Sequence, residues 1–286
     1  MTKIGTFFAI MFFLCTGCGT TPAGASPAET PPAVQTEAPQ ATATPAPATP
    51  SPTPTPTPAP EPTPEPTPTP TPLPLAGHII CLDPGHCVTP EAGKGHRELM
   101  SPLSTETKPV YTTGTQGAGL TEEKLNLIVG LKLRDALEAL GAEVVMTREV
   151  SEITITGIER CEIANESGAD VHIHIHADGY SDSRVHGVSV LVPTGEYLGT
   201  PSIKDESVRL GELMVDAVAA ETGAKNRGII ARYDLTGLNF SEIPSVFIEM
   251  GYMTNPDEDA RLNTEEYQDK IVQGMVNSIL AWYGVE

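Results

Sequence analysis

Apolar and polar residues alternate along residues 171–178, which read Val-His-Ile-His-Ile-His-Ala-Asp. Because successive side chains of a strand point to opposite faces, Val171, Ile173 and Ile175 share one face and three histidines share the other. The pattern therefore predicts a strand with an apolar face toward the core and an imidazole face. A solvated strand and a metal site both present such a face, so this pattern alone leaves the two interpretations open.

Other apolar runs predict further strands at residues 78–82, 143–146, 187–192 and 244–249. The first of them is closed by a tight Asp-Pro-Gly turn, so His86 stands at a strand end, where open α/β sheets place their sites. The last run ends in Glu249, and the histidine strand carries His176 near its end. Three side chains that can bind metal or protons thus lie at the ends of predicted strands.

An apolar stripe at helical spacing predicts a helix between Thr121, which can cap it, and Gly141, which can end it. Glu122 lies in the middle of that stripe at the helix start, whereas Glu123 is expected to point well away from it. A carboxylate on the buried side of a first turn needs a partner, and a cation is the strongest one. The alternative is that Glu122 only caps a fraying helix end. Further helices are predicted over residues 156–167, 205–221 and 265–282.

This order of elements predicts the fold class. Strands separated by helices are typical of a layered α/β domain, with helices on both faces of a central, mostly parallel or mixed sheet. Residues 87–120 are rich in Gly, Pro, Ser and Thr. A loop of this length inside a compact domain is usually functional, so we expect a rim or lid over the site.

The first 18 residues have the layout of a secretory signal. Lys3 precedes an apolar run over residues 4–14 that is too short to span a bilayer comfortably. Cys18 follows Gly17, and the segment resembles a bacterial lipoprotein signal, in which such a cysteine becomes the lipidated first residue. Cys15 stands where leucine is usual. We predict an extracytoplasmic protein anchored to the membrane through lipidated Cys18, with ordinary cleavage and secretion, or an uncleaved anchor, as alternatives.

Residues 19–75 consist largely of Thr, Pro, Ala and Glu. Such a segment cannot bury enough apolar surface to offset the entropy of ordering it, so the sequence predicts a disordered linker. The predicted domain, residues 76–286, holds 16 of the 17 Lys and Arg and 33 of the 37 Asp and Glu. This acidic balance repels polyanions, so nucleic acid is not an expected partner. The odd cysteine count in the domain argues against a disulfide framework. We expect the protein to be a monomer.

Four segments of this domain together resemble the zinc-dependent N-acetylmuramoyl-L-alanine amidases, in the order of that family. They read Leu-Asp-Pro-Gly-His at residues 82–86, Glu-x-x-x-Asn-Leu at 122–127, Ile-His-Ala-Asp at 175–178 and Pro-Ser-Val-Phe-Ile-Glu-Met-Gly-Tyr-Met-Thr-Asn-Pro at 244–256. The combination is highly specific, although any one segment alone is weak evidence. Two positions depart from the family pattern, since Cys87 stands where glycine is usual and Asp178 replaces the commoner asparagine.

The resemblance implies a Zn²⁺ ion bound by His86, Glu122 and His176, with Glu249 as the catalytic glutamate. Three protein ligands leave a fourth tetrahedral position for water, whose pKa zinc lowers toward about 7. Glu249 would accept the water's proton and return it to the departing amine. The implied reaction is hydrolysis of the amide between the lactyl group of N-acetylmuramic acid and L-alanine in peptidoglycan. His174 is expected to line the cleft, with metal ligation as the alternative.

Two other functions remain open at the level of the sequence. A zinc-containing peptidoglycan-binding module would keep the fold without turnover, but it has no need of a general base at Glu249. A zinc carboxypeptidase acting on stem peptides would need an arginine or a similar group to fix a free carboxylate. The long segment 87–120 could supply such a group.

Overall fold

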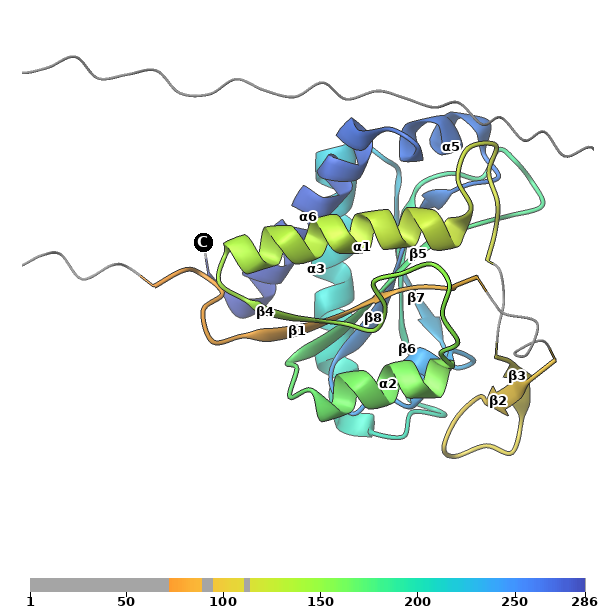
Figure 1. Ribbon diagram of the computed structural model, residues 1–286, viewed down its shortest axis with the longest axis vertical. Coiled ribbons are helices and arrows are strands. Elements are labelled where there is room, and N and C mark those ends of the chain that lie inside the picture. Colours follow the sequence, from red (N-terminus) through yellow and green to blue (C-terminus); the bar gives the residue numbers. More distant parts are fainter. Residues whose placement is uncertain (1–71, 89–94, 111–113, 286) are drawn as a thin grey trace, which may run out of the picture. The chain divides into compact units, whose positions relative to one another are not determined.

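Residues 72–88, 95–110 and 114–285 are described by a computed structural model (Figure 1). The predicted signal segment with Cys18 and almost all of the predicted linker lie outside these residues. Leu75 is fully buried, and its amide donates to the carbonyl of Leu140 at 2.9 Å. The core therefore includes a residue just before the predicted domain start at Ala76. Among the described residues, no helix is long and apolar enough to cross a membrane.

A six-stranded sheet forms the centre of the domain. Its strands are β1 Ile79–Pro84, β4 Glu143–Met146, β5 Val171–Asp178, β6 Val188–Pro193, β7 Asn226–Arg232 and β8 Ser245–Tyr252. Their order across the sheet is β4-β1-β5-β8-β6-β7. All neighbours run parallel except β6 and β8, which are antiparallel. The predicted mostly parallel or mixed sheet is confirmed, and β5 lies in its interior.

Helices cover both faces of the sheet, as the sequence predicts (Figure 1). The helices are α1 Glu122–Ala139, α2 Gly157–Glu166, α3 Lys204–Thr222, α4 Thr236–Asn239, α5 Pro256–Leu262 and α6 Glu265–Tyr283. α1, α3 and α6 enclose the main core on one face, where Ile80, Leu82 and Ile173 meet the apolar stripe of α1. Each such side chain contributes about 1.5–3 kcal/mol when fully buried. On the opposite face, Ala164 of α2 packs in a smaller cluster with Cys81.

The sequence signals at helix ends act as expected with one exception. Gly141 follows α1 and adopts a φ of 94°, the left-handed region that favours glycine. Thr156 starts α2 with a capping box, in which its side chain accepts from the amide of Glu159 and the Glu159 side chain accepts from the amide of Thr156. Thr121 occupies the N-cap position of α1 but makes no cap hydrogen bond. Its hydroxyl donates instead to Oε1 of Glu123 at 2.9 Å.

The predicted rim segment contains an antiparallel hairpin of β2 (Arg97–Leu99) and β3 (Thr107–Pro109). Strands of three residues are too short to give a periodic signal, so the sequence did not reveal them. Glu98 fixes the hairpin, because its carboxylate accepts from the amide of Ile158 at 3.1 Å. This amide lies in the first turn of α2, where the helix dipole favours an anion. Lys108 lies opposite Glu98 in the register of the two hairpin strands.

Candidate active site

His86, Glu122 and His176 are brought together at one edge of the sheet. Oε1 of Glu122 lies 3.1 Å from Nε2 of His86 and 3.0 Å from Nδ1 of His176. The potential ligand atoms of the three side chains all lie within 4.8 Å of one another. Two imidazole nitrogens and one carboxylate oxygen at this spacing are a donor set that can hold a metal ion.

The topology explains why these residues meet. β1 and β5 are parallel neighbours, so the carboxyl ends of both strands reach the same edge of the sheet. His86 follows β1 with a φ of 59°, the only positive φ of a non-glycine residue in the described part of the chain. Such backbone strain clusters at functional sites. At Gly85 a Cβ atom would come within 2.2 Å of the His176 ring, so only glycine lets the two segments approach this closely.

Glu122 is almost fully buried, and its carboxylate is surrounded by donors. The amide of Thr115 donates to Oε2 at 2.7 Å, while Nδ2 of Asn126 and the amide of Ala177 donate to Oε1 at 3.3 Å each. Burial by itself opposes ionisation, but the hydrogen bonds and charges of His176 and His86 outweigh it and lower the pKa of Glu122. The carboxylate is therefore ionised and oriented for a cation.

Two of the other residues singled out in the sequence lie outside this group. Glu123 is expected to point away from the apolar stripe, and its side chain is nevertheless only 4% exposed. Its Oε1 accepts from the hydroxyl of Thr121, which gives the side chain a local polar partner. His172 is fully buried, and within the described part of the chain neither of its ring nitrogens has a hydrogen-bond partner. The histidine face of β5 is thus not a solvated strand face.

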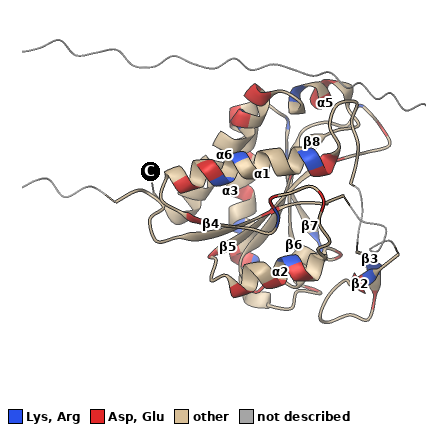
Figure 2. Cartoon of the chain, in the orientation of Figure 1, with Lys and Arg blue, Asp and Glu red and all other residues tan. Residues whose placement is uncertain are grey.

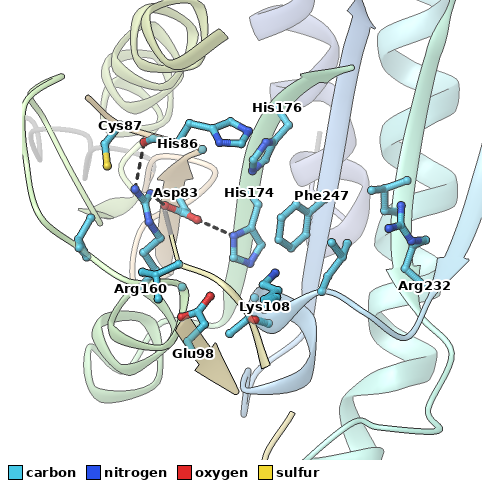
Figure 3. A pocket seen from close by; sticks show the side chains of 18 of the residues that line it. Asp83, His86, Cys87, Glu98, Lys108, Arg160, His174, His176, Arg232 and Phe247 are labelled. Carbon is cyan, nitrogen blue, oxygen red and sulfur yellow. Dashed lines mark hydrogen bonds and ion pairs between the residues drawn. The ribbon is translucent and has the colours of Figure 1, made fainter. Parts of the chain in front are cut away.

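His174 lines the pocket below His176 (Figure 3). Its Nδ1 lies 2.6 Å from Oδ2 of Asp83, and its ring stacks on Phe247 with centroids 3.8 Å apart. Asp83, His172 and His174 form a second group of potential ligands. The guanidinium of Arg160 already contacts the same carboxylate of Asp83, so a cation is present at that position.

Asp83 and Arg160 form a buried ion pair that supports His86. Arg160 also donates to the carbonyl oxygens of Pro84 and His86, each at 3.0 Å. Burial alone would raise the pKa of Asp83, but Arg160 and His174 hold it well below its usual range. Because this pKa is depressed, the pair stabilises the fold above the ordinary aspartate pKa of about 4, and this contribution is lost as the pH falls further.

We expect Arg160→Met to destabilise the protein by about 3–5 kcal/mol, because it leaves the buried carboxylate of Asp83 without its cation. Urea unfolding at pH 7 measures this difference. Arg134→Met is the matched control, since Arg134 forms its ion pairs with Asp135 and Glu149 at the surface. Equal unfolding free energies for the two variants would show that the buried pair has no special role in stability.

Glu249 lies beside the converging group on the neighbouring strand. It is in register with His176 across β5 and β8, and its Oε2 is buried without a hydrogen-bond partner among the described residues. Burial raises the pKa of Glu249 well above its usual value, and the charges of Glu122 and Asp178 add to this effect, whereas Arg232 opposes it. A carboxylate with a raised pKa and an unused oxygen is suited to accept a proton.

A pocket of about 360 Å³ connects these residues with the hairpin (Figure 3). It is lined by residues of all strands of the sheet except β4, of both hairpin strands and of α2 and α4, so the predicted rim borders the site. Its charged lining residues, histidines aside, are Asp83, Glu98, Lys108, Arg160, Arg232 and Glu249. Of these, the sequence analysis named only Glu249 as a functional residue. Asp83 belongs to the Leu-Asp-Pro-Gly-His segment but has no role assigned there, and the other four belong to no motif that separates them from surface charges.

The chain matches the family model described as N-acetylmuramoyl-L-alanine amidase (Amidase_3) over residues 80–281. It is 26% identical over 215 residues to N-acetylmuramoyl-L-alanine amidase Rv3717 of Mycobacterium tuberculosis, which covers 74% of this chain and 89% of that protein. It is 27% identical over 210 residues to N-acetylmuramoyl-L-alanine amidase LytC of Bacillus subtilis, covering 73% of this chain and 36% of that one.

Solved structures agree with this match. The amidase Ami1 of Mycobacterium smegmatis has a TM-score of 0.67 at 29% identity, covering 73% of this chain and 98% of its own. The apo form of Ami1 of Mycobacterium abscessus has a TM-score of 0.66 at 28% identity, covering 73% and 100%. Since the family model covers most of the chain, the protein belongs to the N-acetylmuramoyl-L-alanine amidase family and is an enzyme that hydrolyses peptidoglycan.

Proposed function

We propose that this amidase depends on Zn²⁺, held by His86, Glu122 and His176, and that it hydrolyses the bond between the lactyl group and L-alanine. The observation that carries the proposal is the convergence of these three donor groups beside Glu249, whose buried Oε2 has no hydrogen-bond partner in the part of the chain that the structure describes. Two nitrogens and one carboxylate oxygen fit a catalytic zinc site, which keeps one position open. When bound, Zn²⁺ supplies a Lewis acid that polarises the carbonyl and makes water a better nucleophile at neutral pH.

The protein's own side chains orient the metal-binding residues and transfer the proton. Thr115 and Asn126 hold the carboxylate of Glu122, and Arg160 holds the backbone of His86, so the donors are fixed before substrate arrives. Glu249 accepts the proton of the attacking water through Oε2 and returns it to the departing amine of L-alanine. Burial raises the pKa of Glu249, which favours uptake of the proton from the water.

Digestion of purified cell wall by the zinc-loaded protein tests this function. The expected products are glycan strands with free lactyl carboxylates and stem peptides with a new L-alanine amino terminus. Release of a carboxy-terminal residue from the stem peptide, with the lactyl amide intact, would instead favour the carboxypeptidase. Wall binding without any new terminus would favour the binding module.

A peptidoglycan amidase acts outside the cytoplasm, and we further propose that this one is held at the membrane by lipidated Cys18. The support is the sequence pattern of the first 18 residues, followed by the Thr/Pro-rich segment 19–75 as a spacer. Mass spectrometry of the mature amino terminus should find a diacylglyceryl group on Cys18, and Cys18→Ala should release the protein from the membrane fraction. An unmodified amino terminus at another residue would contradict the anchor.

A further inference from the structure

Lys108 and Arg232 place positive charge in the pocket of an acidic protein. The whole chain has a formal net charge of −20, and acidic side chains are spread over its helices (Figure 2). Lys108 comes from β3 of the hairpin and Arg232 from the end of β7, and both line the pocket that contains His176 and Glu249 (Figure 3). These two cations come from segments far apart in the sequence.

Several of the other charged side chains near them are engaged within the protein. Arg160 is paired with Asp83, and Glu98 accepts the amide of Ile158 at the start of α2. The two oxygens of Asp234 accept hydrogen bonds from one edge of the Arg232 guanidinium, from Nε at 2.7 Å and from Nη2 at 2.8 Å. The contact with Asp234 holds Arg232 in place but uses only part of its hydrogen-bonding capacity.

Donors are left over on both cations. Across the described residues, Lys108 makes no ion pair within 4.0 Å, and Nη1 of Arg232 donates to no acceptor. Burial lowers the pKa of Lys108, and the nearby charges of Glu98 and Asp234 offset this only in part. A partly desolvated ammonium gains more from an incoming anion than a solvated one, because less hydration is lost when the ion pair forms.

The two cations line the same pocket as Glu249, the residue that serves the departing peptide in the proposed reaction. Glu249 returns its proton to the amine of L-alanine, so the peptide extends from that group. Arg232 and Glu249 both line this pocket, and the charge of Arg232 lowers the pKa of Glu249, so the guanidinium faces the same cavity as the general base. The first free carboxylate that a stem peptide can present beyond L-alanine belongs to its second residue.

We propose that Lys108 and Arg232 form a subsite for the carboxylate of the residue that follows L-alanine in the stem peptide. The inference rests on the proposed function, because it assumes cleavage at the lactyl amide. The preferred substrate class is then a muramoyl-L-alanyl peptide whose second residue keeps a free carboxylate, and the corresponding carboxamide is a poorer substrate. Such an anion-binding group is also what the carboxypeptidase alternative would require, so the test must identify the bond that is cleaved.

The test compares two soluble probes that differ in one group, N-acetylmuramoyl-L-alanyl-D-glutamate and N-acetylmuramoyl-L-alanyl-D-isoglutamine. The zinc-loaded parent should show a kcat/KM about 10- to 100-fold higher for the carboxylate, the range for a hydrogen bond to a charged group. Calorimetry with the product dipeptides L-alanyl-D-glutamate and L-alanyl-D-isoglutamine reads the same preference without turnover.

Variants assign the preference to the two side chains. Lys108→Gln and Arg232→Gln should each reduce the ratio of the two kcat/KM values, and Lys108→Arg should restore it because the charge is kept. Lys225→Gln, which removes an exposed lysine outside the pocket, is the control with the same change in net charge. Thermal unfolding of each variant shows whether the hairpin and β7 remain folded.

The outcomes separate the two levels of the proposal. A parent that cleaves both probes with equal kcat/KM and binds both dipeptides equally overturns the subsite alone. So do folded Lys108→Gln and Arg232→Gln variants that lower kcat/KM for both probes in the same proportion. A zinc-loaded parent that cleaves neither lactyl amide, nor that of cell wall, overturns the proposed function. In that case a carboxylate preference in calorimetry would still place the anion site at these residues.

Discussion

Replacing Glu122 by alanine should yield a folded protein that no longer retains Zn²⁺ and no longer hydrolyses peptidoglycan. Oε1 of Glu122 is the atom on which both imidazoles converge, so its removal leaves only His86 and His176 as donors. Two protein ligands are fewer than a catalytic zinc site uses. Loss of an outer hydrogen-bond partner already costs about 10- to 100-fold in metal affinity, and loss of the ligand should therefore exceed about 100-fold.

Glu123→Ala is the control for this variant. Both glutamates lie in the first turn of α1, and they are 3% and 4% exposed, so burial and helix position are matched. Only Glu122 belongs to the converging group. Elemental analysis after dialysis and competition with a chromogenic chelator measure zinc directly. Stoichiometric zinc in Glu122→Ala, or equal zinc loss in both variants, would rule out Glu122 as a ligand.

The elements that carry the candidate site could be predicted because each has a strong local signal. His86, His176 and Glu249 follow or end apolar runs that are long enough to be recognised as strands. The structure places these strands, β1, β5 and β8, side by side and parallel. Their carboxyl ends therefore share one edge of the sheet, and the rule for sites in α/β sheets applies to all three residues together.

Features that depend on long-range pairing could not be predicted in this way. The antiparallel contact of β6 with β8 joins segments more than 50 residues apart and leaves no trace in either strand's own pattern. Arg160, Lys108 and Arg232 look like ordinary surface charges in the sequence, because only the folded chain shows which carboxylate or cavity each one faces. Short α4 and α5 were also missed, although Asn255 and Pro256 provide an N-cap and a first-turn proline for α5.

Glu123 shows the limit of helical periodicity at a helix end. Its angular position places it away from the apolar stripe, yet the side chain is only 4% exposed. Arg148 donates to the carbonyl of Glu123 at 2.7 Å and to that of Gly85 at 2.9 Å, which ties the helix start to the turn after β1. A single apolar stripe describes a helix that is covered from one side only.

Glu249→Gln should keep the fold and the zinc but lose nearly all turnover. Glutamine is almost isosteric with glutamate, so packing in β8 is preserved, whereas the amide cannot accept the proton of the attacking water. General acid–base assistance is typically worth about 10²- to 10⁴-fold, and a residue that serves both steps should lie at or above the upper end. Zinc content and kcat/KM are measured on the same preparation, so that metal loss cannot be mistaken for loss of the base.

Asp178→Asn is the matched control, since it makes the same carboxylate-to-amide change near Glu249 and introduces the residue that is commoner in the family. The charge of Asp178 contributes to the raised pKa of Glu249. Removing that charge lowers the pKa of Glu249, so the deprotonated base persists to lower pH. The acidic limb of the kcat/KM profile should then move to lower pH. Turnover at neutral pH should stay within about tenfold of the parent, whereas removing a general base costs at least about 100-fold.

The two variants together distinguish a general base from a residue that only shapes the pocket. A base at Glu249 requires that Glu249→Gln be nearly inactive with zinc bound and that Asp178→Asn shift the pH profile in the stated direction. If Glu249→Gln holds its zinc and still hydrolyses the lactyl amide within about tenfold of the parent rate, the proton must be accepted elsewhere. A loss of that size is smaller than the loss expected when a general base is removed. His174 would then be the next residue to test, because it lines the same pocket and its Nδ1 is held by Asp83 at 2.6 Å.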